Sequence, residues 1–143
     1  MSVAKYKDPS TGEWTPIGLS VGGTSGMEMD LLWENASSTS GFPAQTVELE
    51  LSEYDCVEIV GVYDSYGTRL PSTVVEVGQS GYITGVCPYD TGYVIGVRLC
   101  RVDITGVRFG VSDTLQNGVY TRSESRIVPV KIYGIKNVNK GGN

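Results

Sequence analysis

Thr46-Val47-Glu48-Leu49-Glu50-Leu51 alternates polar and apolar side chains without interruption. Successive side chains of a β-strand point to opposite faces of its sheet. Val47, Leu49 and Leu51 are therefore predicted to face a core, and the two glutamates to face water. Alternation of this kind is typical of antiparallel sheets that are buried on one side only.

Strand-like segments continue on both sides of this stretch, and clusters of turn-forming residues separate them. We expect them at Met29–Trp33, Val57–Tyr63, Thr73–Val77, Tyr82–Cys87, Tyr93–Val102, Val107–Val111, Gly118–Arg122 and Ile127–Ile135. Many short strands with Gly-rich turns are typical of a β-sandwich or jelly roll. We therefore predict an all-β fold, a jelly-roll-like antiparallel β-sandwich spanning residues 27–136.

The composition points the same way. The 143 residues include 19 Val and 8 Ile but only 3 Ala, and β-branched residues favour strands. The length suits one domain, and no apolar run approaches the roughly 20 residues of a membrane-spanning helix. The 19 glycines recur within the expected strands, which predicts bulges or close packing between sheets.

The N-terminal region differs from the rest. Val3–Lys7 and Glu13–Ile17 flank the turn sequence Asp8–Gly12, which predicts a small hairpin arm over residues 1–17. Residues 18–26 form a Gly-rich linker, and residues 137–143 are expected to be a disordered tail. The large apolar residues of the arm are Tyr6, Trp14 and Ile17. A lone hairpin is marginal in water, so the arm should dock either on another protein or on its own domain.

Several kinds of chemistry are excluded or unsupported. The chain has no His, which removes Ser-His and Cys-His catalysis and the commonest zinc ligand. Cys56, Cys87 and Cys100 contain no CxxC pair and are expected to be reduced, half-buried thiols. We predict no catalytic residue, no metal and no cofactor. A pair of acids converging from distant strands, as in glycosidases, stays an alternative.

The charge distribution also limits the partners. A net charge of −5 makes nucleic acid a poor partner, and no segment of the sequence predicts binding to a membrane. Residues 1–70 carry 11 acidic and 3 basic residues, whereas residues 71–143 carry 5 acidic and 8 basic ones. The two halves could therefore pair within one sheet, or steer contacts between subunits.

Tyrosines gather at or near the expected strand ends. The cluster consists of Tyr63, Tyr66, Tyr82, Tyr89 and Tyr93, and all of these except Tyr82 are taken as candidates for ligand binding. A Tyr ring offers an apolar face and a hydroxyl, which suits stacking on sugars or proteins. These four are candidate receptor-binding residues, and the alternative is that they cap the core.

Several segments resemble a domain of bacteriophage and prophage structural proteins. They are Leu31–Asn35, Phe42–Asp55 and the closing strand Ile127–Lys136, together with the opening Lys5–Trp14, KYKDPSTGEW. The opening is similar to the N-terminal attachment segments of tail or head fibres. No collagen-like or coiled-coil shaft is present, which favours a short fibre, spike, head fibre or decoration protein.

The resemblance implies a non-enzymatic virion surface protein that folds in the bacterial cytoplasm. Its arm, with Tyr6, Trp14 and Ile17, is expected to attach it to a capsid, baseplate or tail protein. Its β-domain is expected to bind host-surface glycan, and such proteins are usually homotrimers. The alternatives are a free carbohydrate-binding module and, less favoured, a glycan depolymerase.

Overall fold

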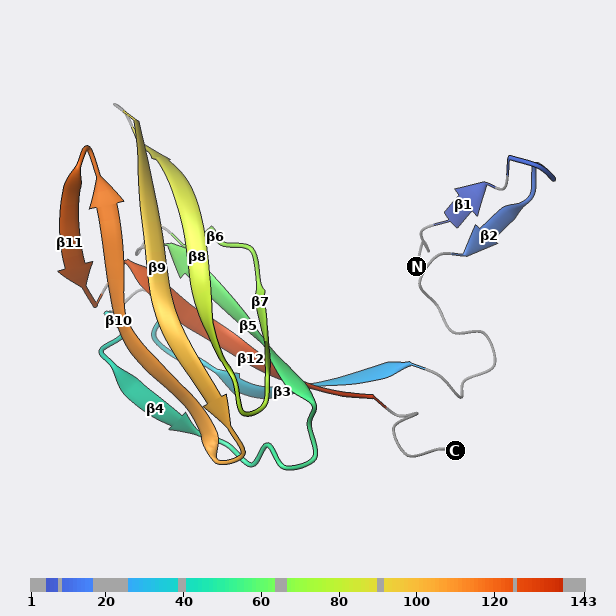
Figure 1. The fold of residues 1–143 in the computed structure, drawn as a ribbon, viewed down its shortest axis with the longest axis horizontal. Coiled ribbons are helices and arrows are strands. Elements are labelled where there is room, and N and C mark those ends of the chain that lie inside the picture. Colours follow the sequence, from blue (N-terminus) through green and yellow to red (C-terminus); the bar gives the residue numbers. More distant parts are fainter. Residues whose placement is uncertain are drawn as a thin grey trace. The chain divides into compact units, whose positions relative to one another are not determined.

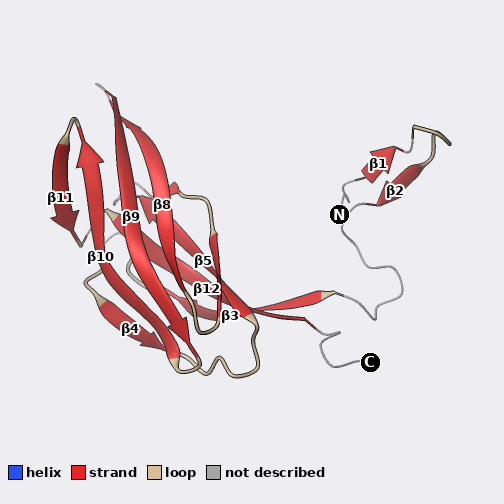
Figure 2. Cartoon of the chain, in the orientation of Figure 1, coloured by secondary structure: helices blue, strands red, loops and turns tan. Residues whose placement is uncertain are grey.

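The computed structural model describes residues 5–7, 9–16, 26–38, 41–63, 67–89, 92–124 and 126–137. The chain divides into two compact units, Met1–Met27 with Asn137–Asn143, and Glu28–Lys136. Within the described ranges every regular element is a strand (Figure 2). No helix there is long and apolar enough to cross a membrane.

The first unit contains the expected hairpin. Strands β1 (Lys5–Lys7) and β2 (Trp14–Pro16) pair antiparallel, with Tyr6 opposite Thr15. The turn between them includes Gly12, whose φ of 74° is a conformation that glycine adopts without steric cost. The predicted hairpin is thus confirmed. The side chains of Tyr6 and Trp14, and all of Ile17, lie outside the described part of the chain.

The second unit consists of two antiparallel sheets (Figure 1). The first, here called the β5 sheet, has the order β3 (Met27–Glu34), β12 (Ile127–Asn137), β5 (Cys56–Tyr63), with β6 (Thr68–Arg69) and β7 (Thr73–Glu76) both pairing with β5. The second, the β9 sheet, has the order β8 (Ser80–Tyr89), β9 (Gly92–Asp103), β10 (Gly106–Gln116), with β4 (Gln45–Glu48) and β11 (Val119–Ser123) both pairing with β10. The β-sandwich prediction is therefore confirmed.

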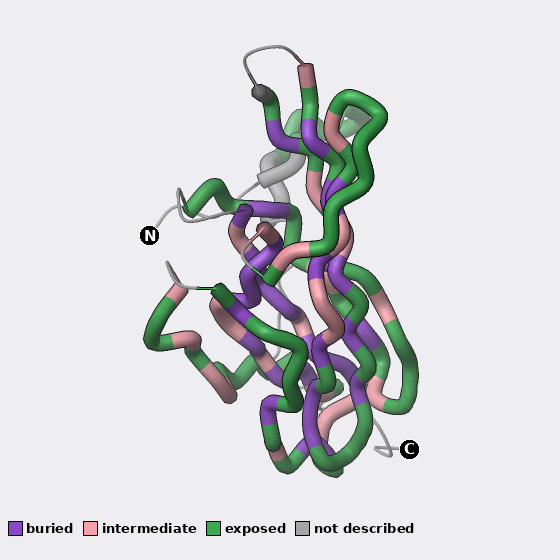
Figure 3. Tube along the Cα trace, turned by 90° about the vertical axis from the view of Figure 1, so that its left-hand side faces the viewer, coloured by how far each residue is buried: buried purple, intermediate pink, exposed green. Residues whose placement is uncertain are grey.

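Burial follows the strand alternation (Figure 3). Val47 and Leu51 are buried and the glutamates between them are exposed, as the alternation predicts. Leu49 is only half-buried because β4 ends at Glu48 and the chain then leaves the sheet. Its amide still donates to the carbonyl of Thr105, which holds this connection against the β9–β10 turn.

Close approach between the sheet edges explains some of the glycines in β8. A Cβ on Gly81 would lie 2.5 Å from a methyl of Val75, and a Cβ on Gly85 would overlap the side chain of Leu70. Val75 and Leu70 belong to the β7 edge of the other sheet or the segment leading to it. The sandwich therefore closes along β7 and β8 only because β8 lacks side chains at these two positions.

An arginine lies in the core. Arg98 of β9 is fully buried, and its Nη1 and Nη2 donate to the carbonyls of Gly110 and Glu124 over 2.7 and 3.1 Å. Its Cζ lies 5.4 Å from the ring centroid of Phe42, which packs edge-to-face on Phe109. Burial lowers the pKa of Arg98 to about 10. The side chain thus ties β9 to the bulged part of β10 and to the segment after β11.

Candidate functional site

The outer side of the β9 sheet carries a large set of exposed apolar side chains. We call it the apolar face, and it consists of Tyr82, Val86, Tyr93, Ile95, Leu99, Leu115 and Tyr120, which are between 42% and 66% exposed. Strand register places four of them in one line, because Leu115 pairs with both Tyr120 and Ile95, and Ile95 pairs with Val86. The line crosses all four long strands of the sheet from β11 to β8.

Polar groups flank this line. In the neighbouring row Asp113 pairs with Arg122, and the carboxylate and the guanidinium Nε are 3.0 Å apart. Towards the far end of β9 and β10, Arg101 and Arg108 lie directly opposite each other. Two like charges therefore border the apolar face at that end, and a pair of this kind is more stable in solvent than when it is buried.

The outer side of the β5 sheet has a different character. A pocket of about 310 Å³ lies over β5, β6 and β12, and its floor includes Val60 and Val62. Arg69, Lys131 and Tyr133 also line it, and we call this pocket the basic notch. Among the described residues, no carboxylate forms an ion pair with Arg69 or Lys131. Two cations beside a Tyr ring over an apolar floor suit an anionic ligand with one apolar side.

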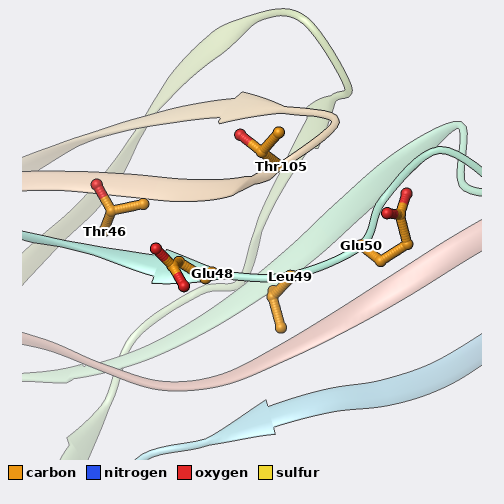
Figure 4. A pocket seen from close by; sticks show the side chains of 5 residues that line it. All are labelled: Thr46, Glu48, Leu49, Glu50 and Thr105. Atoms are coloured by element: carbon orange, nitrogen blue, oxygen red, sulfur yellow. The ribbon is translucent and has the colours of Figure 1, made fainter.

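A second pocket is acidic. About 350 Å³ in volume, it lies beside the end of β4 and is lined by Thr46, Glu48, Leu49, Glu50 and Thr105. Figure 4 shows the two glutamates on either side of Leu49, whose side chain points the other way. Hydrogen bonding from Ser52 lowers the pKa of Glu50, so this carboxyl is ionised at neutral pH. A general acid needs a raised pKa, and Glu50 therefore does not fit that role.

Of the four predicted tyrosines, the structure describes the side chains of Tyr63 and Tyr93, and these two do not lie together. Tyr63 is 8% exposed, because the alternation of β5 turns its ring between the sheets, so it has little surface to offer a receptor. Tyr93 is 66% exposed and lies on the apolar face. The backbone of Tyr89 pairs with Gly92 at the end of β8, but its side chain lies outside the described part, as does all of Tyr66.

The basic notch was not foreseen from the sequence. A signal for it exists in Lys131-Ile132-Tyr133, where the buried Ile132 places its two neighbours on the opposite side of the strand. The contribution of Arg69 has no local signal, because it depends on β6 pairing with β5 beside Val62. Tyr120 joins the apolar face for the same reason, because its place there depends on the pairing of β11 with β10.

The three cysteines lie in the core. All are buried, more deeply than the half-buried state expected from the sequence, and none of them forms a disulfide bond. Burial raises the pKa of Cys100 to about 11, which keeps it protonated and unreactive at neutral pH. The described residues contain no group of three or more Cys, Asp or Glu side chains that could hold a metal ion.

Comparison with known proteins gives no relative: no family model, curated protein or solved structure matches the chain. What the chain does must be inferred from its two units and from the surfaces of its sandwich.

Proposed function

We propose that the chain is a non-enzymatic surface protein of a bacteriophage virion: a short fibre, spike, head fibre or decoration protein. The observation that carries this proposal is the division into a paired N-terminal hairpin and a compact β-sandwich. A protein that attaches through an arm and projects a head domain needs two separate units of this kind. The resemblance of the opening, central and closing segments to phage structural proteins supports the same conclusion.

In this proposal the arm attaches the protein to a capsid, baseplate or tail protein. The β1–β2 hairpin has strands of only three residues each, which is too little for independent stability. Its Tyr6 and Trp14 are of the residue types that most often dominate binding energy at interfaces, and Ile17 is the third large apolar residue of the arm. The arm would then gain its stability from the partner.

Replacing Trp14 with Ala should weaken incorporation of the protein into particles. Loss of a buried aromatic anchor commonly costs about 2 kcal/mol or more of binding free energy. The melting temperature of the sandwich should stay within about 2 °C of wild type, because Trp14 belongs to the other compact unit of the chain. Counting copies per purified particle and recording a melting scan measure both effects.

Thr15→Ala, one residue further along β2, is the matched control and should incorporate normally. Wild-type incorporation of Trp14→Ala with an unchanged melting temperature would remove the anchoring role. A lowered melting temperature would instead show that the arm packs on its own domain.

The basic notch is the part of the sandwich that best fits a host-surface glycan carrying phosphate or carboxylate groups. Charge-assisted hydrogen bonds from Arg69 and Lys131 would hold the anionic group, and the Tyr133 ring would contact the sugar. A volume of about 310 Å³ is at the lower end of ligand pockets and suits one or two sugar units.

Removing either cation should weaken binding to an anionic cell-wall polysaccharide about tenfold, the effect of losing one charged hydrogen bond. The measurement is calorimetric titration of Arg69→Ala and Lys131→Ala against a phosphate-bearing polysaccharide and a neutral one. Arg101→Ala, an exposed arginine of the other sheet, is the control and should bind as wild type. Equal binding of both polymers, or of all variants, would contradict a role for the notch.

A free carbohydrate-binding module is the second candidate, and the basic notch favours it equally. Purified particles distinguish the two candidates. A virion protein co-purifies with the particles at fixed copy number, whereas a free module binds the glycan and is absent from them.

A further inference from the structure

We infer that the apolar face of the β9 sheet binds a second copy of this chain. The inference goes beyond the proposed function, because it follows from the exposed surface of the sandwich and holds whether or not the protein belongs to a virion. It names the surface through which copies would associate.

The size of the apolar face is the first argument. Its seven side chains are about half exposed, and large side chains present about 150–250 Å² when fully open, so together they expose roughly 800 Å². The largest apolar patch of a typical monomer is only about 300–600 Å². A standard protein–protein interface buries about 800 Å² per partner. The face is thus too large for a surface left in water and has the size that one stable interface needs.

The arrangement of residue types is the second argument. Ile95 and Leu115 occupy the middle of the line that crosses the sheet, and Val86 lies at its β8 end. Aliphatic side chains at the centre suit packing against another apolar protein surface, whereas sugar-binding platforms rely on aromatic rings. The tyrosines Tyr82, Tyr93 and Tyr120 add the aromatic type that is enriched at interfaces.

The charges indicate why the partner is the same chain. The central part of the face holds one ion pair, Arg122 with Asp113, and this pair is satisfied within the sheet. Because the charges in this part of the face are balanced, a partner surface needs no complementary charge. The same face on a second copy of the chain meets that condition. Arg101 and Arg108 lie at its edge, where the rim of an interface stays in water.

The N-terminal hairpin is too small to be the occupant. Its three-residue strands are about 10 Å long. The apolar face runs about 20 Å along β8, from Tyr82 to Pro88 opposite Tyr93, and spans four strands about 4.8 Å apart. A hairpin of that size would leave most of the face exposed.

The test is the mass of the full-length chain in solution, measured by sedimentation equilibrium from about 1 to 100 µM. The wild type should have the mass of two or three chains of 15.4 kDa. Ile95→Lys places a charge at the centre of the face and should weaken association at least about 100-fold, leaving a monomer. Leu115→Lys, the neighbour of Ile95 across the strand pair, should do the same.

The matched control is Val74→Lys on β7, an exposed valine of the other sheet, which should keep the wild-type mass. Circular dichroism checks that each variant retains the strand spectrum, and with two face variants the loss of one to misfolding leaves the other to decide. A monomeric wild type at all concentrations overturns the inference, as does an unchanged mass of both folded face variants.

Two other results would assign the face to a different occupant and also overturn the inference. If the wild type is a monomer and Ile95→Lys lowers its melting temperature, the arm covers the face. If the wild type is a monomer and Ile95→Lys abolishes its glycan binding, the face is a sugar-binding platform. Particle incorporation is a separate measurement, so association without incorporation contradicts only the proposed function, and incorporation of a monomer contradicts only the inference.

Discussion

Replacing Arg98 with Ala should lower the free energy of unfolding by about 3–5 kcal/mol, the range for removing a large buried side chain together with its hydrogen bonds. The substitution removes the hydrogen bonds that Arg98 donates to the carbonyls of Gly110 and Glu124, although the Glu124 carbonyl still accepts from the amide of Phe42. It also empties the space beside the Phe42 ring. Both effects act around a side chain that is fully buried. Urea unfolding followed by tryptophan fluorescence measures the change.

Two further substitutions separate the causes. Arg98→Met restores most of the side-chain volume but none of the hydrogen-bond donors. It should therefore lose less unfolding free energy than Arg98→Ala, and the difference between the two variants is the contribution of packing. Arg101→Ala, three residues further along β9 and exposed, should change stability by less than about 0.5 kcal/mol. If Arg98→Ala were as stable as Arg101→Ala, the buried guanidinium would have no structural role.

Gly106→Ala should destabilise the sandwich by about 3 kcal/mol, as a strained backbone and an overpacked contact each commonly cost 1–3 kcal/mol. Gly106 has a φ of 147°, which side chains rarely tolerate. A Cβ there would overlap the carbonyl oxygen of Val47 and lie 3.0 Å from the amide nitrogen of Leu49. These are backbone atoms of the paired segment, so they cannot move aside without breaking the β4–β10 ladder.

Gly110→Ala is the control on the same strand. Its added Cβ would lie 3.6 Å from the Cβ of Leu99, which is an ordinary packing contact. We expect a loss below about 1 kcal/mol, measured as a much smaller drop in melting temperature than that of Gly106→Ala. Equal effects of the two substitutions would show that β10 is sensitive to any side chain and that the β4 contact is not special.

The local sequence was sufficient to predict most of the strands, the hairpin and the sandwich class, but it missed the short strand β6. Alternation is a property of neighbouring residues, and it correctly placed Val47 and Leu51 inside with Glu48 and Glu50 outside. The turn at Asp8–Gly12 was equally local, since Gly12 supplies the positive φ that the hairpin uses. The absence of His likewise excluded whole classes of catalysis without any knowledge of the fold.

Pairing between distant strands decided the rest. From the sequence, Tyr63 could either bind a receptor or cap the core. In the structure β12 and β6 flank β5 at this point, and the Tyr63 ring lies between the sheets and is 8% exposed. Arg98 can be inside only because Gly110 and Glu124 bring carbonyls to its guanidinium from other segments.

The candidate surfaces depend on the same kind of pairing. Residues as far apart as Val86 and Tyr120 become one line through strand register, and the basic notch joins Arg69 to Lys131 across β5. A sequence fixes which face of its own strand a side chain occupies, because that is a matter of backbone geometry. Which strands lie beside it depends on hydrogen bonds closed over tens of residues, and only the tertiary structure specifies those.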